Sequence, residues 1–307
     1  IEEVSEDLRP LIAGHLQGAE GDVVTAQPAH RAADQPTGGP ATASALLSEG
    51  GVVDRDGEVQ QLDDPEAGIA YTGPMAVMVN RLSASASEIF AGAMQDYGRA
   101  LVIGESTFGK GTVQSIQPLN HGELKLTLAK FYRVSGQSTQ HRGVVPDIRY
   151  PSLLDSEEIG ESALPNAMPW DTIPPARYQT SSHLQPFIAQ LQQQHEARAA
   201  KDPDFIYTLA RIGLDNQIKA RETIPLNESK RKQQQEDYEN RLLELENQRL
   251  TARGEEPLTT LEESDPLLAE VHTEDEDSDP KDDAFLLETS HILVDLLQLE
   301  HQVARAN

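Results

Sequence analysis

The chain has no cysteine, a single tryptophan and about half as many basic as acidic side chains. Without cysteine there can be no disulfide, no thiolate nucleophile and no thiolate metal ligand, although the redox compartment stays undetermined. The 25 Lys and Arg residues against 51 Asp and Glu residues give a formal net charge of -26. Such an excess argues against nucleic acid as a partner, because a binder must offer cations to phosphates, and it disfavours anionic membrane surfaces.

Long apolar runs are also missing. No stretch reaches the roughly 18 residues of a membrane span, so we predict no transmembrane segment and expect a soluble chain. Hydrophobic residues make up 37% of the 307 positions, which is low but sufficient for a core. The chain begins at Ile1 with neither an initiator methionine nor a signal segment, so we expect an upstream portion to be missing.

Residues 1–53 lack the pattern of a folded core. A helix could open at residues 5–13 with Ser5 as its cap. From about Gly14 to Gly51, however, Ala, Gly, Pro, Thr and Gln dominate and almost no apolar periodicity is present. We therefore predict an atypical leading segment that is a loop or disordered.

Order is predicted from about residue 73 to residue 150. Residues 75–79 and 101–103 are short apolar runs typical of buried strands, and apolar residues recur between them at helical spacing after Ser87 as a cap. Strand, helix and strand in about 30 residues predict a βαβ unit with parallel strands. Residues 112–119 and 123–134 alternate as two strands of a hairpin. The predicted fold class is α/β with a mixed sheet, forming the C-terminal part of a core over residues 54–150.

The remainder, residues 151–307, is predicted to be a mainly α-helical domain. Helical patterns cover residues 183–200, 203–222, 226–252 and 283–305. Between the last two, residues 262–283 carry eleven acidic side chains against one lysine, which predicts a solvated linker.

A serine in a tight turn and a lysine on a glycine-flanked loop together suggest a nucleophile with an amine base. Ser85 lies between a predicted strand and a predicted helix, where a turn exposes a hydroxyl. The N–H of Ala86, at the start of that helix, can point at a developing oxyanion. Lys110 follows a buried strand between two glycines, so that burial can keep its amine uncharged, and Gln114 on the same strand face can orient it.

Plainer interpretations of these residues stay open. Ser83 and Ser87 are equally small serines in the same turn, and such a string often serves only to cap a helix. A lysine between glycines is often a solvated turn residue. Asp96 lies 11 positions beyond Ser85 on nearly the same helix face, so it is either a third catalytic group or an exposed helix-end residue.

No metal, nucleotide or cofactor site is predicted. The histidines are expected at the surface, His195 among them, and none has a metal-ligand spacing. Gly104-x-x-x-x-Gly109-Lys110 copies most of a phosphate-binding loop. Gly111 then stands where that motif has Ser or Thr, and a strand pattern follows where the motif opens a helix, so nucleotide binding is not expected.

Five short motifs stand out: Ser83-Ala-Ser-Ala-Ser-Glu-Ile-Phe90, Gln95-Asp-Tyr-Gly-Arg99, Thr107-Phe-Gly-Lys-Gly-Thr-Val-Gln114, Lys130-Phe-Tyr-Arg133 and Gly143-Val-Val-Pro-Asp147. At these motifs the chain resembles the tail-specific protease, or C-terminal processing peptidase, family of serine endopeptidases with a Ser/Lys mechanism. The resemblance runs from about Asp54 to the C-terminus, and residues 160–171 resemble the helical extension of the bacterial tail-specific branch.

The resemblance implies a periplasmic endopeptidase without a cofactor. Its substrates would be proteins or peptides with apolar, unfolded C-termini, and an adaptor protein would be a further partner. The roles that it implies are Ser85 as nucleophile, Lys110 as general base, Gln114 as the residue that positions Lys110, Glu88 and Thr107 as supporting residues, and Asp96 as an assisting residue.

Two features of that family have no counterpart in the sequence. No peptide-binding PDZ domain precedes residue 54, and no loop of the Leu-Arg-Asn-Asn-Gly-Gly type follows residues 5–12, where the family completes its oxyanion hole. We interpret residues 22–52 as a frame-shifted or otherwise aberrant segment. Two hypotheses follow: the chain is a serine endopeptidase, or it is a catalytically incompetent fragment that binds a partner protein through its C-terminal helices.

Overall fold

The computed structural model describes residues 50–54, 56–62, 71–155, 157–181, 183–261 and 283–306. They form two compact units. The first holds the described residues up to 149 together with Leu154–Ile188, and the second holds Tyr150–Leu153 and the described residues from Ala189 onward. These compact units divide near residue 188, whereas the sequence pattern changes to helices after about residue 150. The reason is that the segment after Leu154 is bonded into the first unit, for example by Lys130 Nζ, which lies 2.7 Å from Asp171 Oδ1.

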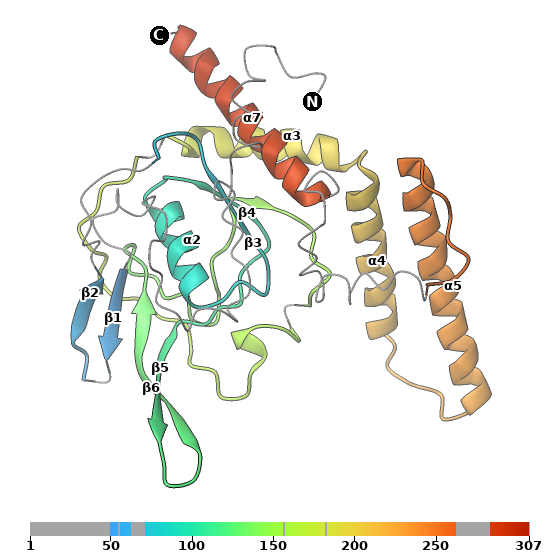
Figure 1. Cartoon of the computed structure of the whole chain (residues 1–307), viewed down its shortest axis with the longest axis horizontal. Helices are drawn as coiled ribbons and strands as arrows, with labels where there is room; N and C mark the ends of the chain where they lie inside the picture. Colours follow the sequence, from blue (N-terminus) through green and yellow to red (C-terminus); the bar gives the residue numbers. More distant parts are fainter. Residues whose placement is uncertain are drawn as a thin grey trace. The chain divides into compact units, whose positions relative to one another are not determined.

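The first unit contains the predicted βαβ element. Strands β3 (Ala76–Val79), β4 (Leu101–Gly104) and β7 (Ile148–Arg149) form a parallel sheet in the order β3-β4-β7. Helix α2 (Ala86–Asp96) connects β3 to β4 and lies beside both (Figure 1). Val77, Met94 and Val102 are fully buried between the helix and the sheet, so the apolar runs that predicted these elements form their core.

A second, antiparallel sheet belongs to the same unit. It contains β1 (Gly50–Asp54), β2 (Val59–Leu62), β5 (Thr112–Pro118) and β6 (Glu123–Tyr132) in the order β2-β1-β6-β5. The α/β class is therefore confirmed, and among the described residues the parallel and antiparallel pairs lie in separate sheets. Strand β1 corrects the prediction for residues 50–53, because pairing with β6, including Val52 opposite Phe131, orders a segment that has no pattern of its own. The rest of the predicted leading segment lies outside the described residues.

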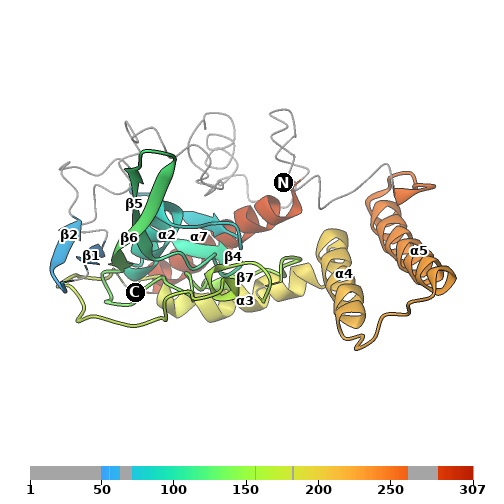
Figure 2. The same ribbon diagram turned by 90° about the horizontal axis from the view of Figure 1, so that it is seen from below.

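The hairpin of β5 and β6 reaches beyond the other strands of its sheet (Figures 1 and 2). Its predicted turn, between Leu119 and Gly122, is closed by a backbone hydrogen bond of 3.0 Å. Leu124, Leu126 and Leu128 are all more than two-fifths exposed. The alternating strand pattern therefore predicted the hairpin correctly, while much of its apolar face is exposed in the described part of the chain.

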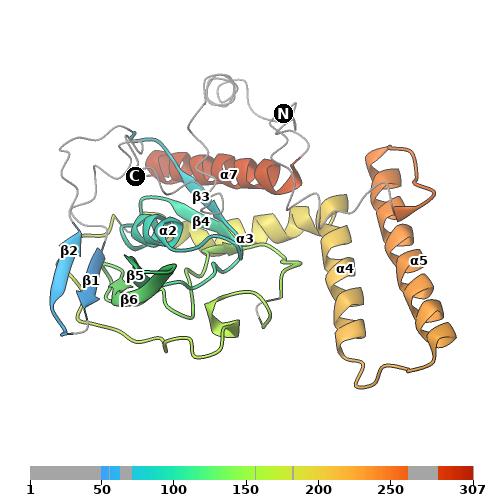
Figure 3. The same cartoon turned by 60° about the horizontal axis from the view of Figure 1, so that its bottom comes forward.

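The second unit is helical, as predicted. Its helices are α3 (Gln185–Ala199), whose first residues belong to the first unit, α4 (Pro203–Lys219), α5 (Glu228–Arg253) and α7 (Ala284–Ala306). Helices α4 and α5 run antiparallel beside each other (Figure 3). A short 3-10 helix, Glu161–Ala163, belongs to the first unit. The predicted acidic linker lies outside the described residues except for Asp283, whose carboxylate accepts from the Phe285 N–H at the start of α7.

Helix α7 contacts α3 and α4 through an aromatic cluster and a buried carboxylate. The rings of Tyr150, His195, Phe205 and Phe285 lie with centroids 4.8–5.5 Å apart. Glu288 accepts from His195 Nδ1 at 3.0 Å and from Arg198 Nη2 at 2.8 Å. The predicted surface position of His195 is wrong, since it is only 3% exposed. An apolar contact face and a charged partner on α7 keep it inside.

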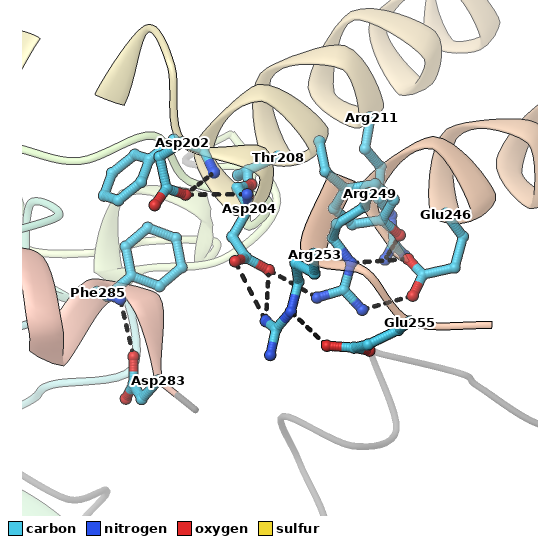
Figure 4. Close-up of polar contacts among 12 residues, drawn as sticks. Asp202, Asp204, Thr208, Arg211, Glu246, Arg249, Arg253, Glu255, Asp283 and Phe285 are labelled. Atoms are coloured by element: carbon cyan, nitrogen blue, oxygen red, sulfur yellow. Dashed lines mark hydrogen bonds and ion pairs between the residues drawn. The ribbon is translucent and has the colours of Figure 1, made fainter. Parts of the chain in front are cut away.

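Helices α4 and α5 are joined by ion pairs, drawn in Figure 4. Arg249 of α5 lies 2.7 Å from Asp204 of α4 and also bonds the buried Glu246 on its own helix. Arg253 adds a second contact to Asp204 at 3.2 Å. Among the described residues, no helix combines the length and the apolar character needed to cross a bilayer.

Candidate active site

Ser85 lies at the sharp turn between β3 and α2. The turn begins at Asn80, whose Oδ1 accepts from the N–H groups of Leu82 and Ser83. Ser85 follows with φ 60° and ψ −112°, directly before the first residue of α2. Few residues other than glycine adopt such a conformation, and functional sites are where it is found most often. The strand, turn and helix expected of an exposed nucleophile are therefore present.

The structure distinguishes Ser85 from the two neighbouring serines. Ser83 is buried, and its Oγ accepts from the Asn80 N–H at 3.1 Å. Ser87 lies inside the first turn of α2 and donates from Oγ to the carbonyl of Ala84 at 2.9 Å. The prediction that Ser87 caps the helix is therefore wrong, because α2 begins at Ala86 and Ser85, two residues earlier, occupies the N-cap position. Of the three serines, only Ser85 has a positive φ.

Glu88 joins the serine turn to the lysine loop. Its side chain is fully buried, and its carboxyl group accepts four hydrogen bonds. Oε2 accepts from the backbone N–H of Ser85 and of Lys110, each at 2.8 Å. Oε1 accepts from the Gly109 N–H at 2.7 Å and from the hydroxyl of Thr107. Burial raises the pKa of Glu88, and the four hydrogen bonds oppose that rise.

One geometric consequence follows from the shared oxygen. Because the nitrogens of Ser85 and Lys110 each lie 2.8 Å from Glu88 Oε2, they are at most twice that distance, 5.6 Å, from each other. A lysine side chain is long enough to span such a gap. The backbones of two positions 25 residues apart in the sequence are thus neighbours in the fold.

Close packing explains why the lysine is flanked by glycines. Gly109 has φ 91°, and a side chain there would begin 2.9 Å from the backbone carbon of His141. At Gly111 a Cβ would lie 2.6 Å from the backbone nitrogen of Gln140. Lys110 between them is half-buried. The chain after Lys110 continues as strand β5, as the sequence pattern predicted, where a phosphate-binding loop would open a helix.

Thr107 connects the same centre to the chain that follows the hairpin. It is fully buried, and its Oγ1, which donates to Glu88, also accepts from the Val144 N–H at 2.7 Å. Glu88 and Thr107, both expected as supporting residues, therefore lie in one hydrogen-bonded network with the backbone of Ser85 and Lys110.

Ala86, Gln114 and Asp96 are more loosely related to this centre. Ala86 is exposed at the first position of α2, where an N–H points out of the helix. Gln114 donates from Nε2 to Thr127 Oγ1 at 3.3 Å, and a register shift between Val113 and Gln114 interrupts the alternation that predicted a shared face with Lys110.

Asp96 lies at the other end of α2 from Ser85. The 11 residues of the helix separate the two by about 16 Å, which no direct hydrogen bond spans. Asp96 is not an exposed end residue either. Its side chain is 10% exposed, pairs with Arg133 and accepts from Ser135 Oγ at 2.9 Å.

Three buried residues near the lysine loop have no signal in the sequence. Arg81 donates from Nη1 to the Thr107 carbonyl at 2.7 Å. Gln140 bonds the Gly111 N–H, and Glu161 bonds Gln140. Each partner is distant in sequence, so only the folded chain brings them together.

Two family models match adjoining parts of the chain. Residues 37–150 match peptidase family S41, and residues 154–298 match the C-terminal domain of tail specific protease. The tail-specific protease of Haemophilus influenzae is 34% identical over 275 residues, which are 85% of this chain and 39% of that protein. The carboxy-terminal-processing protease of Bartonella bacilliformis is 45% identical over 109 residues, 34% of this chain and 25% of that protein. Among solved structures, a photosystem II D1 C-terminal processing protease is 34% identical, covers 38% of this chain and 31% of its own, and gives a TM-score of 0.30.

Residues 37–150 are therefore a peptidase family S41 region, and residues 154–298 correspond to the C-terminal domain of tail specific protease, as the sequence motifs indicated. The chain spans 39% of the length of the Haemophilus influenzae relative.

Proposed function

We propose that the chain is a serine endopeptidase in which Ser85 is the nucleophile and Lys110 the general base. One observation supports this most: the backbone nitrogens of both residues bond the same oxygen of the buried Glu88. These two bonds keep the backbones of Ser85 and Lys110 close together, at a strand-to-helix turn of the kind that presents a nucleophile.

In this mechanism Lys110 takes the proton of the Ser85 hydroxyl as the oxygen attacks the substrate carbonyl. The oxyanion of the tetrahedral intermediate accepts a hydrogen bond from the Ala86 N–H at the start of α2, a donor typically worth about 3 kcal/mol of barrier. The amine of the cleaved substrate then takes this proton from Lys110 and leaves. Water hydrolyses the acyl-enzyme with Lys110 again as base, and the proton returns to Ser85. Gln114 would orient the amine of Lys110 as substrate binds.

The substrates we propose are proteins with apolar, unfolded C-termini, in a bacterial periplasm. Both points rest on the family, whose members are named for processing carboxyl termini. A fluorogenic peptide with an apolar free C-terminus, compared with the same peptide amidated, tests the substrate class.

The decisive experiment compares matched variants. Ser85→Ala and Lys110→Ala should each lower turnover at least about 10³-fold, whereas Ser87→Ala and Lys125→Ala, which change the same residue types outside the network, should leave it within about twofold. Unchanged melting temperatures would show that folding is intact. Full activity in Ser85→Ala or in Lys110→Ala would rule out this mechanism. No Ser85-dependent turnover in the unaltered chain would instead favour a catalytically incompetent fragment that binds a partner through its C-terminal helices.

A further inference from the structure

A buried glutamine connects the lysine loop to the segment that follows Leu154. The Gln140 side chain is fully buried. Its Oε1 accepts from the Gly111 N–H at 2.9 Å. Its Nε2 donates to Glu161 Oε1 at 2.9 Å and to the Met168 carbonyl at 3.2 Å. The amide thus uses both of its ends between two parts of the first unit.

The partners determine how this amide is oriented. The carboxylate of Glu161 and the carbonyl of Met168 can only accept, so the NH₂ end of Gln140 must face them. Its oxygen is thereby directed at Gly111, the residue directly after Lys110. Glu161 is 9% exposed, so its carboxyl group is hydrogen-bonded within the protein and largely shielded from water.

Two further contacts connect residues 159–161 with the lysine loop. The Glu161 N–H donates to the Phe108 carbonyl at 2.9 Å. Arg81 donates from Nε to the Ile159 carbonyl at 2.6 Å and from Nη1 to the Thr107 carbonyl at 2.7 Å. Gly160 allows this approach, because a Cβ there would lie 2.1 Å from Arg81 Nη2. Residues 159–161 therefore hold the loop at points that Glu88 does not reach.

We propose that Gln140 and Glu161 are positioning residues for Lys110. Glu88 fixes the loop at Gly109 and Lys110, and Gln140 fixes it at Gly111, so the backbone on both sides of the base is held. Glu161 acts through Gln140 by keeping its oxygen toward Gly111. The inference rests on the proposed function, since it takes Lys110 to be the general base.

An exchange of donor and acceptor tests the pair. Gln140→Glu sets a second carboxylate against Glu161 and should lower kcat about 10- to 100-fold with KM within about threefold, because a base displaced by about 1 Å loses that much. Glu161→Gln alone should cost less, since its amide oxygen can still accept. The double variant restores a donor and an acceptor with the roles exchanged, and should recover at least about threefold of the lost kcat. Gln137→Glu, at an exposed glutamine nearby, is the control and should change little.

A second measurement does not depend on catalysis. Hydrogen exchange of the backbone amides of residues 108–112 should become at least about tenfold faster in Gln140→Glu, return toward the original rate in the double variant and stay unchanged in Gln137→Glu. If the unaltered chain shows no turnover, the base assignment falls with the proposed function, and faster exchange would still establish the loop contact. Unchanged exchange in Gln140→Glu would overturn the inference. So would faster exchange without any loss of kcat in an active chain, or a double variant that recovers neither property.

Discussion

Two buried glutamates, one in each unit, have opposite surroundings. Glu88 is fully buried and accepts only from backbone N–H groups and a hydroxyl, and burial raises its pKa. Glu288 is 6% exposed and faces the guanidinium of Arg198 and the ring of His195. Although burial opposes it, hydrogen bonds from His195, His291 and Arg198 lower the pKa of Glu288 to about 2. A carboxyl group whose hydrogen bonds all come from neutral donors is costly to bury as an anion, whereas a directly bonded cation reverses the balance.

The different surroundings of Glu88 and Glu288 correspond to different structural roles. Around Glu88 three of the four bonds come from the backbone of Ser85 and of the lysine loop, so the carboxyl group serves to fix the geometry of these loops. Around Glu288 the bonds connect α7 to α3, so their value lies in holding a helix in place.

Glu88→Gln should have the largest effect. At least one buried backbone N–H loses its acceptor and the other bonds lose a charged partner, so we expect the first unit to lose about 4 kcal/mol of unfolding free energy. Urea titration followed by the fluorescence of Trp170, the single tryptophan, reports on this unit. Glu123→Gln, at an exposed position of the hairpin, is the matched control. A loss below about 1 kcal/mol would mean that the backbone of the two loops does not depend on this carboxyl group.

Glu288→Gln should cause the second-largest loss of unfolding free energy, and this loss should depend on pH. A pKa held near 2, against an ordinary 4.5, corresponds to about 3 kcal/mol of stability for the second unit at neutral pH. Because the folded pKa is below the unfolded one, this contribution is present above pH 4.5 and is lost as the pH falls toward about 2.

Urea titrations followed by far-UV circular dichroism at pH 7 and pH 3 measure the effect. The difference in unfolding free energy between the unaltered chain and Glu288→Gln should be smaller at pH 3 than at pH 7. Glu239→Gln, on the exposed face of α5, should have the unfolding free energy of the unaltered chain at both pH values. A difference of the same size at both pH values would contradict the assignment of the stability to the ionised carboxylate.

Asp204→Asn should have the smallest effect. The carboxylate pairs with Arg249 and Arg253, all three side chains being partly exposed, and such pairs contribute about 1 kcal/mol. About 1 M salt should screen most of it, whereas the loss in Glu88→Gln should persist in salt. Thermal unfolding followed by circular dichroism at low and high salt makes the comparison. An effect of Asp204→Asn that ignores salt would show that its hydrogen-bond geometry matters more than its charge.

The elements that the sequence predicts well are those whose signal is local. The apolar runs at residues 75–79 and 101–103 and the helical spacing between them are enough for the βαβ unit, and the four long helices follow from their own periodicity. Strands β1 and β2 were not predicted, because what orders them is pairing with each other and with the distant β6.

The site divides in the same way. Ser85 and Lys110 lie in recognisable short motifs, and helix α2, which starts after Ser85, is predicted by the apolar spacing of its own residues. Gln140 and Glu161 meet partners 29 and 21 residues away, so no local pattern marks them. His195 shows the same limit, since a polar residue on a helix looks exposed until the aromatic cluster around it is known.

The placement of Leu154–Ile188 in the first unit has a practical consequence for dissecting the molecule. Proteolysis or genetic truncation at residue 150 would remove Pro169 and Asp171, which accept the ammonium of Lys130 at 2.6 and 2.7 Å. Lys130 is only 5% exposed in the intact unit, so the truncation would remove both acceptors of an ammonium group that this unit buries. An N-terminal fragment should therefore extend to residue 188 if it is to fold stably in isolation.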